Sequence, residues 1–153
     1  MAIKIVSGGQ TGVDQAALRA ARAAGLETGG WAPQGWATED GPAPWLADWG
    51  LVECEEPGYP ARTRANVRDS DATLWLGDYH SPGGRTTLDA CRLQGKPFMI
   101  CYPVTTRSSQ VVAWIRERSP AVLNVAGNRE STSPGIGARA ERFLAVVFRQ
   151  LAR

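Results

Sequence analysis

Three short segments combine glycines with arginine, hydroxyl and amide side chains, the residue types that bind phosphate. Residues 7–12 read S-G-G-Q-T-G, residues 80–87 read H-S-P-G-G-R-T-T, and residues 124–131 read N-V-A-G-N-R-E-S. Glycine lets the backbone approach a ligand closely, and free amides at the start of a helix attract anions. An arginine guanidinium adds a charged pair of donors that matches a phosphate. The chemistry indicated is the binding of a small anion.

Each segment also has an interpretation that needs no ligand. Thr11 with Asp14 three residues later resembles a capping box. The second segment fits a turn closed by a threonine cap, and the third fits an ordinary loop with a surface pair between Arg129 and Glu130. The first segment lacks the lysine of a P-loop, and its G-G-x-x-G spacing departs from the dinucleotide fingerprint. The coincidence of three such segments favours one extended pocket with at least two arginines.

The elements between these segments predict how they are positioned. Apolar runs predict strands over residues 3–6, 51–54, 72–76, 98–102 and 121–125, and helical patterns cover residues 15–24, 62–68, 87–93, 109–118 and 139–151. This alternation predicts an α/β fold, a Rossmann-like doubly wound parallel sheet in three α/β/α layers, as a single domain over residues 1–153. Such sheets bind ligands beyond the carboxyl ends of their strands, where the three segments fall.

Residues 29–50 contain four of the six tryptophans, and we expect a long ordered loop there. Its tryptophans (Trp31, Trp36, Trp45 and Trp49) could stack on a ligand, lie at a subunit contact, or anchor the loop to the core. The sequence leaves these three roles open.

The composition is that of a soluble globular protein. The chain has 153 residues, 43% hydrophobic and 21% charged, which excludes a disordered chain. It contains no apolar run near the roughly 18 residues of a membrane span and no signal-peptide pattern. Its three cysteines lack C-x-x-C spacing, so we expect reduced thiols, a cytoplasmic protein and no protein-ligated metal. His80, the single histidine, is expected to be an exposed loop residue rather than a general base.

The net charge of +2 conceals an uneven distribution. Residues 1–58 carry 3 basic and 8 acidic side chains, whereas residues 59–153 carry 14 basic and 7 acidic ones. Fifteen of the 17 basic residues are arginine, which suits phosphate binding, while codon bias and a solvated helix surface are the alternative explanation. No basic block alternates with aromatic residues, so the sequence disfavours nucleic acid as a partner.

Motifs over nearly the whole chain resemble one known family. They are S-G-G-Q-T-G-V-D at residues 7–14, R-T-R-A-N-V at 62–67, S-D-A-T-L at 70–74, L-N-V-A-G-N-R-E-S at 123–131 and P-G-I at 134–136. In these motifs the chain resembles the molybdenum-cofactor carrier family, a Rossmann-like group related to the Lonely-guy (lysine-decarboxylase-like) and SLOG nucleotide-ligand proteins. The resemblance implies a homo-oligomer, dimer or tetramer, with a pocket for the phosphorylated pterin of molybdenum cofactor (molybdopterin) and a molybdoenzyme as acceptor.

The wider superfamily includes nucleotide phosphoribohydrolases with a P-G-G-x-G-T-x-x-E motif, which residues 82–90 match only in part. Thr86 replaces the third glycine, and the position of the catalytic glutamate falls on Ala90. Asp89 is adjacent, but one residue along a helix turns a side chain by about 100°. Because N-glycosidic cleavage needs a positioned carboxylate, we expect binding without turnover and no catalytic residue. Glu130 and Asp14 remain as replacements.

The expected function is therefore to carry, store or protect molybdenum cofactor or a related phosphorylated nucleotide-like ligand. The alternatives are an N-glycosidic hydrolase of the phosphoribohydrolase type and a sensor of a nucleotide second messenger. The expected ligand-binding residues are Gly8, Gly9, Gln10, Thr11, Gly12, Asp14, Arg62, Asn66, Gly83, Gly84, Arg85, Thr86, Thr87, Asn128, Arg129, Glu130 and Ser131.

Overall fold

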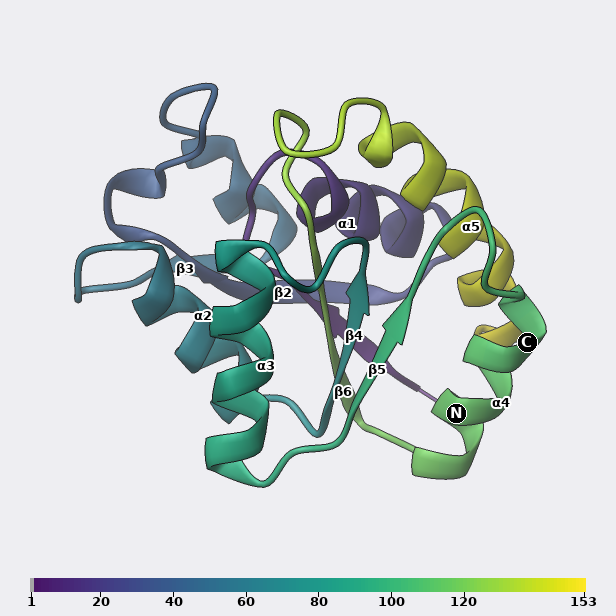
Figure 1. Cartoon of the computed structure of the whole chain (residues 1–153). Helices are drawn as coiled ribbons and strands as arrows, with labels where there is room; N and C mark the ends of the chain where they lie inside the picture. The colour runs from purple at the N-terminus through teal and green to yellow at the C-terminus, as the bar shows by residue number, and fades with distance from the viewer. Residues whose placement is uncertain (1) are drawn as a thin grey trace.

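The computed structural model describes residues 2–153 and contains one six-stranded sheet in which all strand pairs are parallel (Figure 1). The strands are β1 (Lys4–Val6), β2 (Glu27–Ala32), β3 (Leu51–Glu53), β4 (Ala72–Leu76), β5 (Phe98–Cys101) and β6 (Val122–Gly127), and their order across the sheet is β3-β2-β1-β6-β4-β5. β6 therefore enters the middle of the sheet between β1 and β4. The fold is the expected Rossmann-like α/β single domain.

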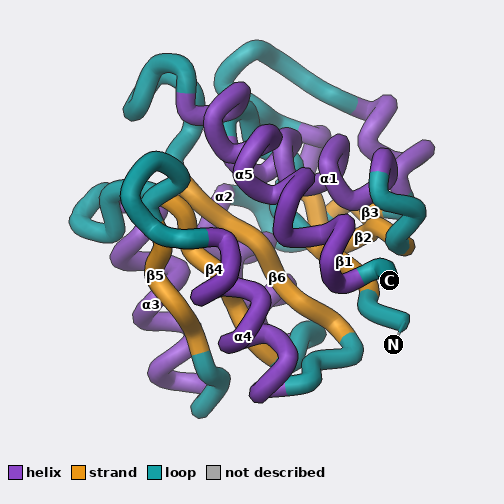
Figure 2. Tube along the Cα trace, turned by 90° about the vertical axis from the view of Figure 1, so that its right-hand side faces the viewer, coloured by secondary structure: helices purple, strands orange, loops and turns teal. Residues whose placement is uncertain are grey.

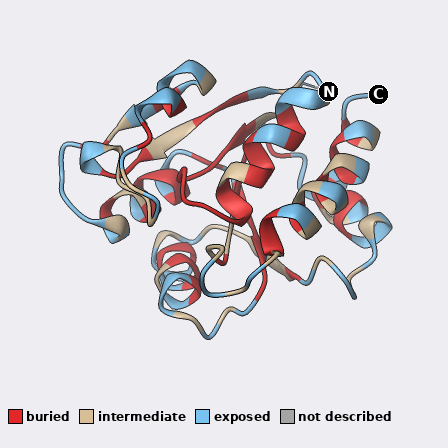
Figure 3. Ribbon diagram, turned by 90° about the horizontal axis from the view of Figure 1, so that it is seen from above, coloured by how far each residue is buried: buried red, intermediate tan, exposed pale blue. Residues whose placement is uncertain are grey.

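Helices cover both faces of the sheet (Figures 1 and 2). The helices are α1 (Val13–Ala23), α2 (Tyr59–Arg68), α3 (Pro82–Gln94), α4 (Ser108–Arg118) and α5 (Ile136–Leu151). On one face α5 packs against both α1 and α4, and on the other face α2 packs against α3. Because each helix has an apolar stripe facing the sheet, burial concentrates between these layers (Figure 3).

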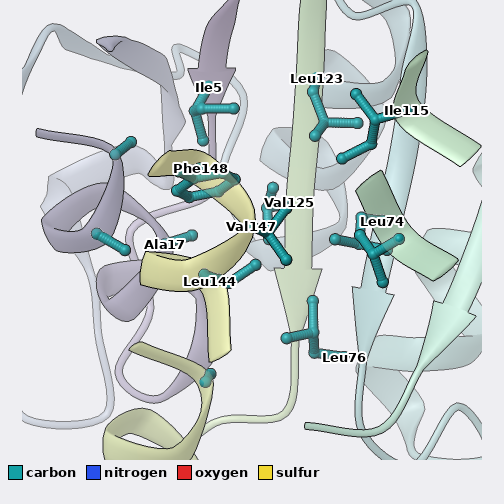
Figure 4. Close-up of a cluster of buried hydrophobic side chains, with 14 of the residues drawn as sticks. Ile5, Ala17, Leu74, Leu76, Ile115, Leu123, Val125, Leu144, Val147 and Phe148 are labelled. Carbon is teal, nitrogen blue, oxygen red and sulfur yellow. The ribbon is translucent and has the colours of Figure 1, made fainter. Parts of the chain in front are cut away.

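The largest core cluster lies between the sheet and the α1–α5 layer (Figure 4). Leu144, Val147 and Phe148 of α5 are fully buried against the central strands, where Ile5 and Val125 are fully buried as well. Full burial of each such side chain contributes on the order of 1.5–3 kcal/mol. This packing fixes α5, and with it the segment that precedes α5, against the first strand and helix.

The register brings the three glycine segments together. Val6 pairs with Asn124, and Leu76 pairs with Gly127, so β1, β6 and β4 end at the same edge of the sheet. The segments that follow these strands are therefore neighbours at one edge, as a parallel sheet requires.

The expectation of a long loop over residues 29–50 is wrong at its start, because β2 occupies Glu27–Ala32 and pairs with both β1 and β3. Adjacent glycines concealed this strand, since glycine is normally unfavourable in a strand interior. Gly30 is required by a close approach: its φ is +123°, and a Cβ there would lie 2.4 Å from the backbone oxygen of Ser7. The remainder forms two short 3₁₀ helices, Gln34–Trp36 and Pro44–Trp49.

The tryptophans of this region differ in environment. Trp36 and Trp49 pack against a small cluster that includes Leu46, whereas Trp45 is 43% exposed and meets Trp49 edge to face. The ring nitrogen of Trp31 donates to Asp69. Two of the four therefore anchor the segment to the molecule.

All five helices begin earlier than expected, α2 and α5 by three residues and α3 by five. α3 starts at Pro82 rather than residue 87, and α2 starts at Tyr59 rather than residue 62. Both have proline in the first turn, where a missing N–H costs nothing. Among residues 2–153, no helix is long and apolar enough to cross a membrane.

Candidate functional site

A cavity of about 470 Å³ lies at the carboxyl ends of the central strands, among the three glycine segments and the start of α2. Nine of the seventeen residues expected to bind ligand line it: Gln10, Asp14, Arg62, Gly83, Thr86, Thr87, Asn128, Arg129 and Ser131. The other eight, Gly8, Gly9, Thr11, Gly12, Asn66, Gly84, Arg85 and Glu130, are not among the lining residues. The volume falls within the range of small-molecule sites.

Two arginines and one buried carboxylate define the charge of the cavity. The Arg62 Nη2 atom lies 3.7 Å from Asp14 Oδ2, with the two side chains only 13% and 4% exposed. The guanidinium carbons of Arg62 and Arg129 lie 5.5 Å and 5.2 Å from the ring centre of Tyr59, a cation–π arrangement with both arginines. Arg62 and Arg129 are thus gathered beside one ring at the cavity wall.

Burial raises the pKa of the Asp14 carboxyl above its ordinary value, because desolvation disfavours the charged form. The Arg62 guanidinium, the backbone N–H of Gln10, the side chain of Ser7 and the more distant Arg129 act in the opposite direction. The net effect is a carboxyl that takes up a proton more readily than an exposed aspartate. Its Oδ2 atom accepts a hydrogen bond of 3.2 Å from the N–H of Gln10.

Gly8 allows Arg62 to lie across the first segment. A Cβ at Gly8 would come within 2.6 Å of Arg62 Nε. That nitrogen is buried without a hydrogen-bond partner, as is Gln10 Nε2. Unpaired buried polar atoms are costly, and Arg62 and Gln10 both line the cavity together with Asp14.

Amides at the first segment and at the start of α1 donate hydrogen bonds within the protein. The capping-box interpretation of Thr11 and Asp14 is wrong. Gly12, at φ +77°, occupies the cap position of α1, and no side chain caps this helix. The amide of Thr11 donates to Gln10 Oε1 at 3.0 Å, and the amide of Val13 donates to the backbone oxygen of Asn128 at 3.2 Å. A Cβ at Gly12 would lie 2.4 Å from that same oxygen, so its glycine serves close packing between the first and third segments.

Glu39, which was not among the expected site residues, joins the first and third segments through hydrogen bonds. Its carboxylate accepts hydrogen bonds from the hydroxyls of Thr11 and Ser131 and, at 3.1 Å, from the Ser131 amide, while its own N–H donates to Gln10 Oε1 at 2.9 Å. Burial alone would raise the pKa of Glu39, but the hydrogen bonds from Ser131 and Thr11 outweigh it and hold the pKa below its ordinary value. An isolated acid in a loop gave no sequence signal for this role.

Most polar side chains of the third segment form hydrogen bonds with other groups of the protein. Asn128 Oδ1 accepts from the Asp78 N–H at 2.7 Å, and its Nδ2 donates to Asp78 O and Ser81 Oγ, each at 3.1 Å. Glu130 accepts from the amides of Gly135 and Gly137 at the start of α5. Glu130 therefore stabilises a helix N-terminus and does not line the cavity, whereas Arg129 does.

Residues 82–87 of the second segment form the start of α3 rather than a loop before it. Ser81 caps the helix by accepting from the Gly84 amide at 3.2 Å, so the cap is a serine and not the expected threonine. The hydroxyls of Thr86 and Thr87 donate to backbone oxygens four residues earlier. Arg85 is exposed on the helix and does not line the cavity, and His80 is also exposed, beside the ring of Tyr79.

Asn66 ties two elements together instead of facing the cavity. Its side chain accepts from the Trp31 N–H at 2.8 Å and donates to the Trp31 oxygen at 3.1 Å, and the residue is 3% exposed. Asn66 thus fastens α2 to the end of β2.

Nine further residues that were not expected line the cavity, among them Tyr59, Thr63 and Trp75. Thr63 accepts a hydrogen bond of 2.8 Å from Arg62, and Trp75, 2% exposed, donates from its ring nitrogen to the Gly77 oxygen. Trp75 belongs to an apolar strand and is indistinguishable from a core residue in sequence. Thr63 adjoins Arg62 in the R-T-R-A-N-V motif, which is the one signal that could have found it.

A second cavity, of about 590 Å³, lies between β3 and α2, with Trp31, Cys54 and Arg64 in its wall. Cys54, Cys91 and Cys101 are free and buried. Within residues 2–153, no group of three or more His, Cys, Asp or Glu side chains is arranged to hold a metal ion.

Comparison with known proteins identifies the family of this chain. No curated protein matches the chain. A crystal structure from Syntrophus aciditrophicus SB, of a protein provisionally named a molybdenum carrier protein, is similar, with a TM-score of 0.85, 33% identity, and coverage of 96% of this chain and 94% of that one. The model of the Circularly permutated YpsA SLOG family matches residues 5–148. Since this match covers nearly the whole chain, the protein belongs to the Circularly permutated YpsA SLOG family.

Proposed function

We propose that the protein binds molybdenum cofactor, or a related phosphorylated nucleotide-like ligand, in the cavity at the carboxyl ends of the strands. The observation that carries this proposal is the pair Arg62 and Arg129 beside Tyr59 in the cavity wall. Two guanidiniums in a half-buried cavity suit a phosphate, because charge-assisted hydrogen bonds are strong where water is scarce. The name given to the similar protein supports the choice of ligand.

In this proposal the lining residues contact different parts of the ligand. Arg62 and Arg129 neutralise the phosphate, and the N-terminus of α3 at Gly83 adds its positive dipole end. Thr63 presents a hydroxyl that can donate to the polar edge of the ligand, whereas the Ser131 hydroxyl donates to Glu39 and can only accept from the ligand. The first glycine segment contributes shape rather than amides, because several of its N–H groups donate within the protein.

The proposed role is to carry, store or protect the ligand without turnover. Glu130 is occupied by the start of α5, and Glu39 is occupied by Thr11 and Ser131. We further propose a homo-oligomer in the cytoplasm that passes its ligand to a molybdoenzyme.

A second candidate function is N-glycosidic hydrolysis of a nucleotide, and one observation favours it. Asp14 lines the cavity, and its raised pKa suits an acid that protonates a leaving base. Incubation with nucleoside monophosphates and chromatography of the released base tests this function. Base release by the wild type that disappears in Asp14→Asn would replace the carrier role, whereas release at the no-enzyme rate excludes hydrolysis of these substrates.

The carrier role is tested by what copurifies with the protein. We expect protein made in a bacterial host that synthesises molybdenum cofactor to retain a pterin, measured by its fluorescence after oxidation, together with molybdenum, measured by mass spectrometry. The Arg129→Ala and Arg62→Lys variants should bind on the order of 10- to 100-fold more weakly, since a hydrogen bond to a charged group contributes about 1.5–3 kcal/mol. Arg62→Lys keeps a positive charge beside Asp14.

Arg85→Ala is the matched control, because Arg85 is exposed outside the cavity wall. It should retain wild-type amounts of pterin and molybdenum. Equal retention by all four proteins would contradict the assignment of Arg62 and Arg129, and absence of both pterin and molybdenum from the wild type would contradict the proposed ligand.

A further inference from the structure

Arg62 has an anionic partner inside the cavity before any ligand arrives. Asp14 Oδ2 lies 3.7 Å from Arg62 Nη2, and both residues line the cavity. An oxyanion that binds Arg62 must share or replace this carboxylate. The cavity therefore contains a competitor for its own proposed ligand.

The burial of Asp14 makes its ionised form unfavourable once an oxyanion has displaced the carboxylate from Arg62. Asp14 is 3% exposed, so little water reaches its carboxylate to replace Arg62. An ionised carboxylate left in such a place without compensation is costly, and a second anion nearby adds repulsion. Protonation removes both costs.

On the basis of the proposed anion site, we propose that Asp14 is an internal counter-anion of Arg62 and takes up one proton when an oxyanion binds. The charged groups that face Asp14 are Arg62 from α2 and Arg129 from the segment after β6, and the first glycine segment contributes the N–H of Gln10 and the side chain of Ser7. Both cations are the groups that a bound oxyanion would neutralise. Binding therefore weakens the interactions that keep Asp14 ionised.

The direction of the pH dependence follows from this competition. Burial already raises the pKa of Asp14, and loss of the opposing effect of Arg62 raises it further in the complex. Between the pKa of Asp14 in the free protein and its pKa in the complex, oxyanion affinity should fall about tenfold per unit rise in pH, because one proton is bound with the ligand. The ligand is then held more tightly at lower pH.

The experiment uses sulfate, which stays fully ionised between pH 5 and 8, so any pH dependence belongs to the protein. Titration calorimetry of wild-type protein, in two buffers of different ionisation enthalpy, measures the protons taken up per sulfate. We expect uptake approaching one proton within the pH range that separates the two pKa values of Asp14. Chloride keeps the ionic strength constant.

Asp14→Asn is the diagnostic variant, because asparagine has the same shape and can still accept from the Gln10 N–H. It should bind sulfate with no proton uptake and with pH-independent affinity, and it should bind more tightly than the wild type wherever the wild type is pH-dependent. Asp89→Asn, which changes an exposed acid on α3 paired with Arg92, is the matched control and should behave as the wild type.

The outcomes separate the inference from the function on which it rests. Equal heats in the two buffers at every pH, or an Asp14→Asn variant with wild-type pH dependence, would overturn the role of Asp14 while leaving the carrier role intact. Failure of both proteins to bind sulfate would overturn the inference together with the anion site. Copurification of a pterin, measured separately, then decides whether the carrier role survives.

Discussion

Individual arginines acquire their roles from their surroundings and not from their type. Arg62, Arg85 and Arg129 are all expected from the sequence to bind ligand, Arg85 and Arg129 from their glycine segments and Arg62 from the family resemblance. The structure places Arg62 and Arg129 in the cavity wall and leaves Arg85 exposed on α3. Arg62 reaches its position because Gly8 has no side chain to obstruct it.

Gly8→Ala tests this close approach. The new Cβ would lie 2.6 Å from Arg62 Nε, and the arginine, a flexible side chain, is the group that must move. We expect a loss of sulfate affinity of about tenfold or more by calorimetry, with a change in unfolding free energy within about 1 kcal/mol in urea. Unchanged affinity would show that the position of Arg62 over Gly8 does not matter for binding.

Connections between elements rely on polar side chains that resemble ligand-binding residues in sequence. Asn66 joins α2 to β2, Asn128 joins the end of β6 to the segment after β4, and Glu130 stabilises the start of α5. Glu39 joins the first and third segments. These residues position the cavity wall, and of the four only Asn128 is itself a lining residue.

Asn66→Ala tests the connection of α2 to β2. It would leave the N–H and the oxygen of Trp31 without their partner, and an unsatisfied buried polar group costs about 1–3 kcal/mol. We expect a loss of unfolding free energy of that size in urea. Gln94→Ala removes an exposed hydrogen bond from α3 to α2 and should change stability by less than about 0.5 kcal/mol. Equal effects of the two variants would contradict the proposed difference.

At the scale of the whole molecule, the order of strands makes the two ends of the sequence interdependent. β6, the last strand, separates β1 from β4, and α5 packs against α1 (Figure 2). The central layer therefore includes contacts between residues more than a hundred positions apart. Its unfolding should be a single cooperative transition.

A pair of substitutions on α5 tests this dependence. Leu144 is fully buried in the main core cluster, and Leu144→Ala should cost roughly 2–5 kcal/mol of unfolding free energy, because it removes buried contacts and leaves a cavity. Val146, on the same helix, is 37% exposed, so Val146→Ala should cost less than about 1 kcal/mol. Thermal or urea unfolding followed by circular dichroism measures both. A small effect of Leu144→Ala would show that α5 contributes little to the core.

The sequence by itself determined the parallel α/β fold, most strands and helices, and the edge of the sheet where the glycine segments gather. These features follow from local periodicity and from the rule that parallel strands end together. It did not reveal β2, because Gly29 and Gly30 weaken the strand pattern, and the need for glycine at position 30 follows only from the close approach of Ser7. Only the tertiary structure decided which polar residues face the cavity and which connect elements. The physical reason is that an asparagine or glutamate has the same side chain in both roles, and only its surroundings in the fold determine its hydrogen-bond partners.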